Sequence, residues 1–235
     1  MNGDISDTSL LSVVMPCYNE RETIREIVER VQAVPLNTEI IIVDDGSTDG
    51  TREILAGLEG DGVRVIYHPE NRGKGAALST GYAAVRGDVV IIQDADLEYD
   101  PAEYLELIGP IQKGVADVVF GSRFGGKPQR VHMFWHKMGN HALTFLTNLL
   151  LNCTLTDMET CYKMFRREVI EGMTLHSSRF DVEPEFVAKI FRARKWRVYE
   201  VPISYYGRTY DEGKKITWFD GILAVRALIR YRFWD

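Results

Sequence analysis

The chain has 235 residues, of which 45% are hydrophobic and 26% charged, a balance typical of a soluble globular protein and not of a disordered one. This length can bury the core of one α/β domain. No run of about 18 apolar residues occurs, and the start, MNGDISDTS, lacks the basic and apolar regions of a signal peptide. We therefore expect no membrane-spanning helix. Three cysteines without a CxxC pair favour a reduced, cytosolic chain.

The charges are divided unevenly along the chain. Residues 1–120 hold 9 Lys and Arg against 22 Asp and Glu, whereas residues 121–235 hold 19 against 12. Between Asp117 and Asp157 there is no acidic residue. This asymmetry predicts a cation site in the first half and an anionic partner for the second. No nucleic acid is expected among the partners.

The first half alternates strand and helix signals. Strands are predicted at residues 10–16 (LLSVVMP), 39–44, 63–68 (VRVIYH), 89–92 (VVII) and 117–123 (DVVFGSR). Helices are predicted from Asn19, with Glu22 as its capping-box partner, after residue 50, over 74–85 and after Pro101. Apolar strands that alternate with helices indicate a parallel sheet covered on both faces, and therefore an α/β fold.

The second half is less regular. We predict an amphipathic helix at 132–152, a strand at CYKMF, a helix at FDVEPEFVAKIFRARK, a strand at RVYEVPISYY and a last helix at about 217–233. No repeat or linker separates two domains. The prediction is one domain over 1–235, divided into 10–123, 124–210 and a loop and amphipathic helix at 211–235.

Acidic residues follow two of the predicted strands. Ligands of parallel sheets bind at the carboxyl ends of strands. Asp94 and Asp96 alternate in an extended segment and so face one space, where their mutual repulsion favours a divalent cation such as Mg²⁺ or Mn²⁺. Glu98 continues the spacing as a third ligand or as turn chemistry. Asp45 is expected to bind a ribose or base, or else to stabilise a turn. Asp49 and Asp100 are expected to cap the next helix or fill a turn.

Eight motifs in order resemble family-2 glycosyltransferases of the GT-A fold. They are VVMPCYNERETI, IIIVDDGSTDGT, NRGKGAAL, VVIIQDADLEYDP, VFGSRF, TDMETCYKMFRREV, FDVEPEFVAKI and VPISYYGRTYDEGKKI. The later motifs resemble the branch of dolichyl- and polyprenyl-phosphate mannose and glucose synthases. The resemblance extends from about Ser12 to Phe233.

The resemblance implies a donor site in the first stretch and an acceptor site in the second. It assigns the nucleotide-sugar pocket to Pro16, Tyr18, Glu20, Asp45, Lys74 and Asp94, with Gly73 and Gly75 beside Lys74. Asp94 and Asp96 would form the DxD metal motif, and Glu98 stands where relatives often have Gln. NRGKGAAL lacks the Walker A spacing.

The implied reaction is transfer of a hexose, mannose or glucose, from a GDP- or UDP-sugar to a dolichyl or polyprenyl phosphate, with inversion. A phosphate acceptor is already ionised and needs no general base, but it needs positive charge to hold it in line. Arg123, Arg130 and Arg208 are the predicted phosphate ligands, and Asp96, Arg123 and Arg130 the predicted catalytic residues. Lys137, His132 and His136 fit a helix surface better.

Other side chains and two other functions stay open. Asp157 and Glu159 orient these arginines or the sugar, or form a structural salt bridge. The helices near 132–152 and 217–233 combine aromatic and basic residues, which suits a peripheral position on the cytoplasmic face of a membrane, alone or with a membrane-anchored partner subunit. The alternatives are a family-2 transferase with a soluble hydroxyl acceptor, and a nucleotide-sugar-binding subunit without turnover.

Overall fold

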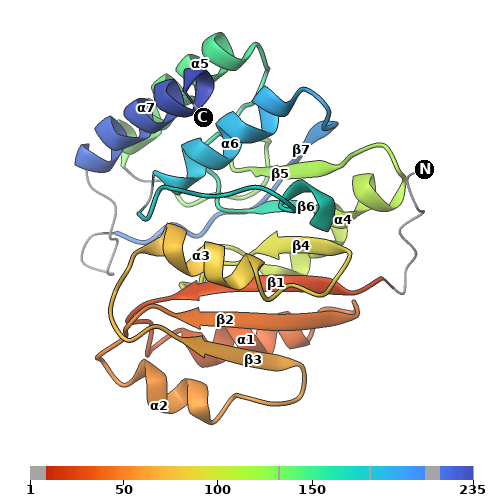
Figure 1. The fold of residues 1–235 in the computed structure, drawn as a ribbon, viewed down its shortest axis with the longest axis vertical. Helices are drawn as coiled ribbons and strands as arrows, with labels where there is room; N and C mark the ends of the chain where they lie inside the picture. Colours follow the sequence, from red (N-terminus) through yellow and green to blue (C-terminus); the bar gives the residue numbers. More distant parts are fainter. Residues whose placement is uncertain (1–8, 132, 180, 210–217, 235) are drawn as a thin grey trace.

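The computed structural model describes residues 9–131, 133–179, 181–209 and 218–234. Seven strands form one sheet in the order β3-β2-β1-β4-β6-β5-β7 (Figure 1). The strands are β1 Leu11–Cys17, β2 Thr38–Asp44, β3 Val63–Tyr67, β4 Val89–Ile92, β5 Val118–Ser122, β6 Lys163–Arg166 and β7 Val198–Pro202. The helices are α1 Ile24–Gln32, α2 Thr51–Ala56, α3 Lys74–Tyr82, α4 Tyr104–Gln112, α5 Phe134–Leu151, α6 Val182–Ala193 and α7 Trp218–Phe233. Two short 3₁₀ helices are η1 Pro101–Glu103 and η2 Arg167–Val169.

The sheet is mostly parallel, as the alternation of strands and helices predicts. β1 pairs in parallel with β2 and β4, β2 with β3, and β5 with β7. β6 is the exception, because it runs antiparallel to both β4 and β5. The four β-branched residues of β4 are all buried, since helices cover the sheet on both faces at this strand.

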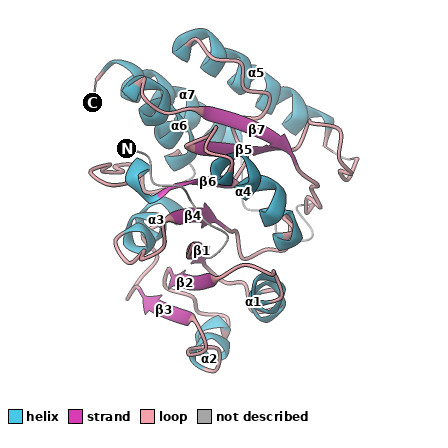
Figure 2. Cartoon of the chain, turned by 90° about the vertical axis from the view of Figure 1, so that its right-hand side faces the viewer, coloured by secondary structure: helices cyan, strands magenta, loops and turns pink. Residues whose placement is uncertain are grey.

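Helices lie on both faces of the sheet (Figures 1 and 2). α3 packs on β1 and β2, and α6 lies on the same face, whereas α1 and α4 cover the opposite face. The predicted apolar stripe of α1 is buried. α5 and α7 lie against α6 at the end of the sheet where β7 stands, and Ala227, Leu228 and Tyr231 of α7 are buried at this contact.

The predicted start of the first helix is wrong. α1 begins at Ile24 with Thr23 as N-cap, and no side chain caps it, so Glu22 forms no capping box. Asn19 has a left-handed φ of 51°, and its side-chain oxygen accepts a hydrogen bond from the amide of Thr48 at 2.9 Å. The side chain of Asn19 thus ties together the loops after β1 and β2, and the helix can begin only after that link.

The turn roles predicted for two acids are confirmed. Asp100 accepts a hydrogen bond from the amide of Ala102 at 3.0 Å and caps η1. Asp49 accepts hydrogen bonds from the amide and hydroxyl of Thr51.

Two predicted segments lie wholly or partly outside the residues that the structure describes. Most of the loop GRTYDEGKK, and the predicted start of the last helix at Thr217, lie outside the described residues. Among the helices that are described, none is both long and apolar enough to cross a bilayer. Cys17, Cys153 and Cys161 form no disulfide.

Candidate active site

Several ionisable side chains come together at the edge where the parallel strands end. Glu20, Asp45 and the pair Asp94 and Asp96 follow β1, β2 and β4, and Arg123 follows β5. Because β6 runs in the opposite direction, it begins at this edge, and the segment that leads into it, 157–162, lies there as well. α3 and α6 also begin here, with Lys74 and Glu183 in their first turns.

Asp94 belongs to a buried ionic cluster. The ammonium of Lys74 lies 2.8 Å from Oδ1 of Asp94 and 3.2 Å from Oε1 of Glu183, and it donates to Sγ of Cys161 at 3.1 Å. Lys163 binds the other oxygen of Glu183. Burial opposes the charge on Lys74, but its acidic neighbours, Asp94 first, more than offset this and hold its pKa well above the usual value. In the same way, burial raises and Lys74 lowers the pKa of Asp94, with a net lowering.

Asp96 faces a different cation, Arg208 from the loop after β7. Nη2 of Arg208 lies 2.8 Å from Oδ2 of Asp96, and Nη1 lies 3.3 Å from Oε2 of Glu20. Burial, followed by the charges of Asp94 and Glu98, raises the pKa of Asp96 to about 7, although Arg208 acts to lower it. Asp96 therefore carries a carboxylate that one guanidinium does not fully compensate.

Glu98 anchors the loop that carries Arg208. Its two carboxylate oxygens accept hydrogen bonds from the hydroxyl of Tyr205 and the backbone amide of Arg208, both at 2.7 Å, and its carbonyl accepts from the amide of Tyr206 at 3.0 Å. These contacts are turn and loop chemistry. The metal role of Glu98 stays a prediction.

The metal role of Asp94 and Asp96 stays a prediction, which the chemistry of two carboxylates fits. In the described residues, no three His, Cys, Asp or Glu side chains gather as a metal-binding group. Asp94 and Asp96 lie at one edge, and the raised pKa of Asp96 marks negative charge that a second cation would relieve. Two carboxylates with phosphate oxygens and water are a common Mg²⁺ or Mn²⁺ shell.

Asp45 holds the loop that precedes α3. Its oxygens accept hydrogen bonds from the amides of Arg72 at 3.0 Å and Gly73 at 2.7 Å, and His68 Nδ1 lies 2.7 Å away. Asp45 is almost fully buried, with 3% of its surface exposed. This arrangement positions Lys74, which follows directly. The nucleoside roles of Asp45, Glu20, Pro16 and Tyr18 stay predictions; Pro16 and Tyr18 lie at the end of β1 and just beyond it.

Gly73 and Gly75 let a second segment approach the start of α3. A Cβ on Gly73 would lie 2.1 Å from the carbonyl oxygen of Ser178, and one on Gly75 would lie 2.0 Å from that of Ser177. Gly73 also has a φ of 92°, which favours glycine. The amide of Gly75 donates to the Ser178 carbonyl at 2.8 Å. The NRGKG motif is thus a packing site for the segment before α6, in addition to its predicted role beside the donor.

Arg123 is held by a bidentate pair with Asp157. Nε and Nη2 of Arg123 lie 2.6 and 2.8 Å from the two carboxylate oxygens, and the guanidinium lies 5.0 Å from the ring centre of Tyr205. Burial opposes the charge, but Asp157 outweighs it and raises the pKa of Arg123 further. The guanidinium has five N–H groups, so this pair leaves other donors for an anion.

The other predicted basic residues are placed less centrally. Arg130 donates to the carbonyl of Gly207 at 3.2 Å, in the same loop as Arg208. Lys137 lies over the ring of Phe124, 5.4 Å from its centre. His132 lies outside the described residues.

The carboxyl of Glu159 is influenced by the charges of two ion pairs, Lys163 with Glu183 and Arg123 with Asp157. Burial is the main cause that raises its pKa to about 7; Lys163 and Arg123 lower it, whereas Glu183 and Asp157 raise it. Its Oε1 atom is buried and has no hydrogen-bond partner among the described residues. The sequence predicts that Glu159 orients an arginine or the sugar, or forms a structural salt bridge, and these roles stay predictions.

Sequence reasoning overlooked four residues of this edge. Glu183 and Lys163 form the buried pair beside Lys74, His68 contacts Asp45, and Tyr205 binds both Glu98 and Arg123. In the sequence, Glu183 is one of several acidic residues in FDVEPEF, and an acidic residue is common in the first turn of a helix. Its pairing with lysines therefore could not be predicted. His68 could have been found, because it follows β3 directly and thus lies at the same edge.

Comparison with known sequences identifies the family. The sequence profile of glycosyl transferase family 2 matches residues 12–174. The chain belongs to glycosyl transferase family 2. The family-2 resemblance of the eight motifs is therefore confirmed.

The curated relatives include a hexosyltransferase and two enzymes named for lipid phosphates. The low-salt glycan biosynthesis hexosyltransferase Agl6 of Haloferax volcanii is 31% identical over 212 residues, which are 88% of this chain and 50% of that protein. The dolichol-phosphate mannosyltransferase of Pyrococcus furiosus is 32% identical over 211 residues, 87% of this chain and 58% of that protein. The dodecaprenyl-phosphate galacturonate synthase of Rhizobium johnstonii is 28% identical, with coverages of 87% and 61%. The chain thus spans about half to three fifths of these relatives.

Solved structures show the same fold. Glucosyl-3-phosphoglycerate synthase from Mycobacterium tuberculosis superposes with a TM-score of 0.74 at 22% identity, covering 95% of this chain and 80% of that one. The predicted GT-A type of α/β fold is confirmed.

Proposed function

We propose that this family-2 transferase moves a hexose from a nucleoside diphosphate sugar to the phosphate of a polyprenyl or dolichyl lipid, with a divalent metal at the DxD motif. The observation that carries the proposal is the Arg123–Asp157 pair at the strand edge that also bears Asp94 and Asp96. It offers a fixed guanidinium to a phosphate close to the place where a donor diphosphate would bind. The names of the dolichol-phosphate and dodecaprenyl-phosphate relatives support the same acceptor class.

The donor would lie along the acidic side of this edge. Asp94 and Asp96 would hold Mg²⁺ or Mn²⁺, which supplies electrostatic stabilisation of the departing diphosphate. Lys74, with its pKa held high by Asp94 and Glu183, keeps a full positive charge beside that position. Structures of the mycobacterial synthase were determined with UDP and Mn²⁺ or Mg²⁺, which supports a similar donor and cation here. GDP and UDP sugars, mannose and glucose, all fit the proposal.

The acceptor would lie along the basic side. Arg123, Arg130 and Arg208 would bind the lipid phosphate, whose oxygen attacks the anomeric carbon without needing a base. In the structure, Arg208 contacts Asp96 and Glu20. It therefore lies between the proposed donor and acceptor positions. A phosphate near Arg123 would thus also meet the charge of Arg208.

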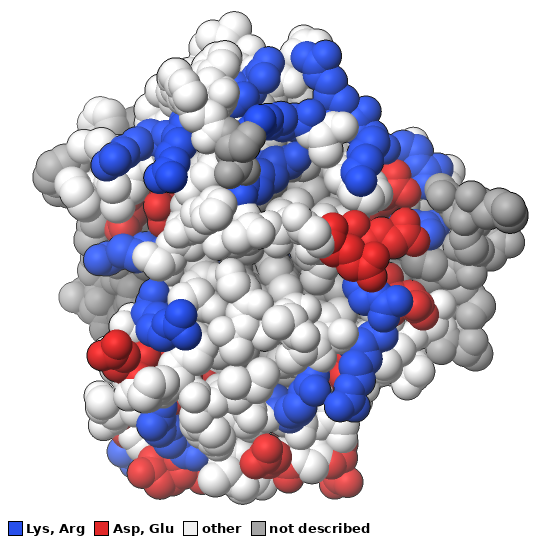
Figure 3. Space-filling view, in the orientation of Figure 1, with Lys and Arg blue, Asp and Glu red and all other residues white. Residues whose placement is uncertain are grey.

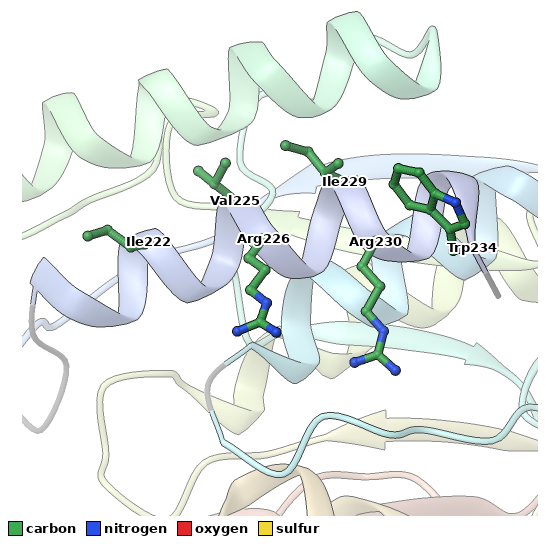
Figure 4. A pocket seen from close by; sticks show the side chains of 6 residues that line it. All are labelled: Ile222, Val225, Arg226, Ile229, Arg230 and Trp234. Atoms are coloured by element: carbon green, nitrogen blue, oxygen red, sulfur yellow. The ribbon is translucent and has the colours of Figure 1, made fainter.

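The lipid would be reached from α5 and α7. On α5, Trp135, Met138, Phe145 and Leu149 recur at helical spacing and are exposed, Trp135 by 81%. A groove of about 620 Å³ runs along α7, and Figure 4 shows its apolar residues projecting on the side toward α5, with Arg226 and Arg230 on the other side. Its lining residues are Ile222, Val225, Arg226, Ile229, Arg230 and Trp234.

This combination of apolar and basic groups suits the headgroup layer of an anionic membrane. Figure 3 shows Lys and Arg gathered over α6 and α7 on one face of the molecule. We place the protein on the cytoplasmic surface of a membrane, with a membrane-anchored partner subunit as a further candidate contact.

A second function is favoured by one residue. A soluble hydroxyl acceptor would need a general base, and Glu159, with a pKa of about 7, has suitable proton affinity for that role. If the acceptor were a soluble hydroxyl compound, Arg123 and Arg130 would have no acceptor phosphate to bind.

The test is transfer of radiolabel into lipid. Purified protein is incubated with Mn²⁺ or Mg²⁺, labelled GDP-mannose or UDP-glucose, and undecaprenyl or dolichyl phosphate, and the lipid is extracted into organic solvent. Label in the organic phase that depends on both metal and lipid phosphate supports the proposal. Label that appears only on a soluble hydroxyl acceptor contradicts it and favours the second function. Nucleotide-sugar binding without any transfer would leave a binding subunit.

A further inference from the structure

Glu159 and its neighbour Thr160 both have polar atoms without a partner. Oε1 of Glu159 and Oγ1 of Thr160 are buried, and neither has a hydrogen bond within the described part of the chain. A buried polar atom that lacks a partner is unfavourable, because it has given up its hydrogen bonds to water without replacing them. Two such atoms in adjacent residues, at an edge rich in ionisable groups, indicate a place where a bound ligand supplies the missing hydrogen bonds.

Their position is between the proposed donor and acceptor sites. On one side Lys163 binds Glu183, which lies 3.2 Å from Lys74 in the donor cluster. On the other side is Asp157, which holds Arg123 of the acceptor site. The charges of Lys163, Glu183, Arg123 and Asp157 all reach the Glu159 carboxyl. In an in-line transfer the sugar lies between the departing diphosphate and the attacking phosphate.

We propose that Glu159 contacts the transferred sugar, accepts hydrogen bonds from its hydroxyl groups, and makes the site select a neutral hexose over a hexuronic acid. The inference rests on the proposed function, because that function places a donor sugar at this position. The neighbouring acids are compensated, Asp157 by Arg123 and Glu183 by two lysines. Glu159 therefore presents the carboxylate that a uronate would meet, and two like charges in a poorly hydrated site repel each other.

The substitution Glu159→Gln keeps the shape and removes the charge. The matched control is Glu168→Gln, since Glu168 is exposed in η2, at the opposite edge of the sheet. Glu159→Asp is the second variant, which keeps the charge on a shorter side chain. Thermal unfolding and the affinity for UDP or GDP alone show whether each variant is folded with an intact nucleotide site.

The experiment measures binding of matched donors by calorimetry with Mn²⁺ present. The pairs are UDP-glucose with UDP-glucuronate and GDP-mannose with GDP-mannuronate, at about pH 8, where a carboxyl with a pKa near 7 is ionised. We expect wild type and Glu168→Gln to prefer the neutral sugar, and Glu159→Gln to reduce this preference about tenfold or more, with unchanged affinity for the nucleotide alone. Glu159→Asp should keep the exclusion of uronates.

Two results would overturn the inference. One is a neutral-to-uronate preference in Glu159→Gln that stays within about twofold of wild type, because removal of a repelling charge should change it more. The other is a loss of turnover in Glu159→Gln at unchanged donor preference, which would make Glu159 a general base. The binding measurements that give the donor preference do not need the lipid acceptor. Failure of lipid transfer in the wild type would therefore reject the proposed acceptor without affecting this comparison.

Discussion

Nη2 of Arg208 lies 2.8 Å from Oδ2 of Asp96, so a loop after the last strand supplies positive charge to an acid that follows β4. Asp96 is buried beside the charges of Asp94 and Glu98, which explains why its pKa is raised to about 7 even with this partner. A divalent cation at the DxD motif would serve the same carboxylate. In the structure, Arg208 is the cation that pairs with Asp96.

Replacing Arg208 with Gln should therefore destabilise the metal-free protein, by about 1–3 kcal/mol, because buried carboxylates lose their partner. Added Mn²⁺ should restore more stability in Arg208→Gln than in wild type, since it would replace the missing charge. Differential scanning fluorimetry with and without Mn²⁺ measures both effects. The control is Arg21→Gln, an exposed arginine near Glu22. Equal Mn²⁺ shifts in wild type and Arg208→Gln would contradict this account.

Arg123→Lys should weaken acceptor binding, because lysine cannot keep the two-pronged contact to Asp157 and still face a phosphate. We expect the KM for polyprenyl phosphate to rise about tenfold to a hundredfold, with little change in affinity for the nucleotide sugar. The measurement is initial rates at varied lipid phosphate.

Arg197→Lys is the matched control for Arg123→Lys. Arg197 forms an equivalent bidentate pair with Asp117, but at the opposite edge of the sheet. If both variants change KM equally, the effect comes from general loss of a salt bridge and the acceptor role of Arg123 is wrong.

Gly75→Ala should be strongly destabilising, because its Cβ would meet the carbonyl oxygen of Ser177 at 2.0 Å and backbone must move. We expect a loss of about 2 kcal/mol or more, as for other backbone overpacking. Gly139→Ala in α5 is the control, since nothing lies within 4 Å of its Cβ position, and alanine there should be neutral or stabilising. Urea denaturation of both variants measures the difference, and similar free energies of unfolding would show that the segment at 177–178 is not held against α3.

Glu159 should make stability depend on pH. Its pKa is raised from the ordinary 4.5 to about 7, so the folded state binds the proton more tightly than the unfolded state. The favourable contribution of the protonated carboxyl is present at low pH and is lost as pH rises through about 7. Relative to wild type, Glu159→Gln should therefore gain about 1–3 kcal/mol between about pH 5 and pH 8. Chemical denaturation at several pH values measures this, and a difference that does not vary with pH would refute it.

The exposed stripe of α5 should bind lipid. Leu149→Asp should lower binding to vesicles that contain anionic phospholipid by about tenfold, because a charge replaces an apolar contact with the bilayer. Leu105→Asp on α4 is the control, a leucine that is also exposed but lies on another helix. Vesicle sedimentation gives the bound fraction. Equal losses in both variants would argue against docking through α5.

The fold could be predicted further than the site. Runs such as Val89–Ile92 and the apolar stripe of α1 follow from local patterns, and both hold in the structure. The reversal of β6 could not be predicted, because the strand KMFR looks the same in either direction and only its pairing with β4 and β5 shows its sense. The helix start at Asn19 failed for a similar reason, since a contact with Thr48 competes with the local capping pattern.

At the site, the sequence shows which types of residue are present, but not which side chains pair with one another. Lys74 and Asp94 are 20 positions apart in sequence, and Arg208 and Asp96 are 112 apart, so neither pair follows from spacing. Glu98 illustrates the limit. Its spacing matches that of Asp94 and Asp96, but Tyr205 and the amide of Arg208 bind it, and both lie in a segment far along the chain.

The reversed strand β6 has a mechanical consequence. It joins β4, which leads to the DxD motif, directly to β5, which leads to Arg123, through backbone hydrogen bonds on both sides. The proposed donor and acceptor sites therefore share one continuous sheet. Opening the proposed site for a long lipid would then come from the segments beyond the strands, and the two proposed phosphate positions would be separated by two strand spacings, because β6 lies between β4 and β5.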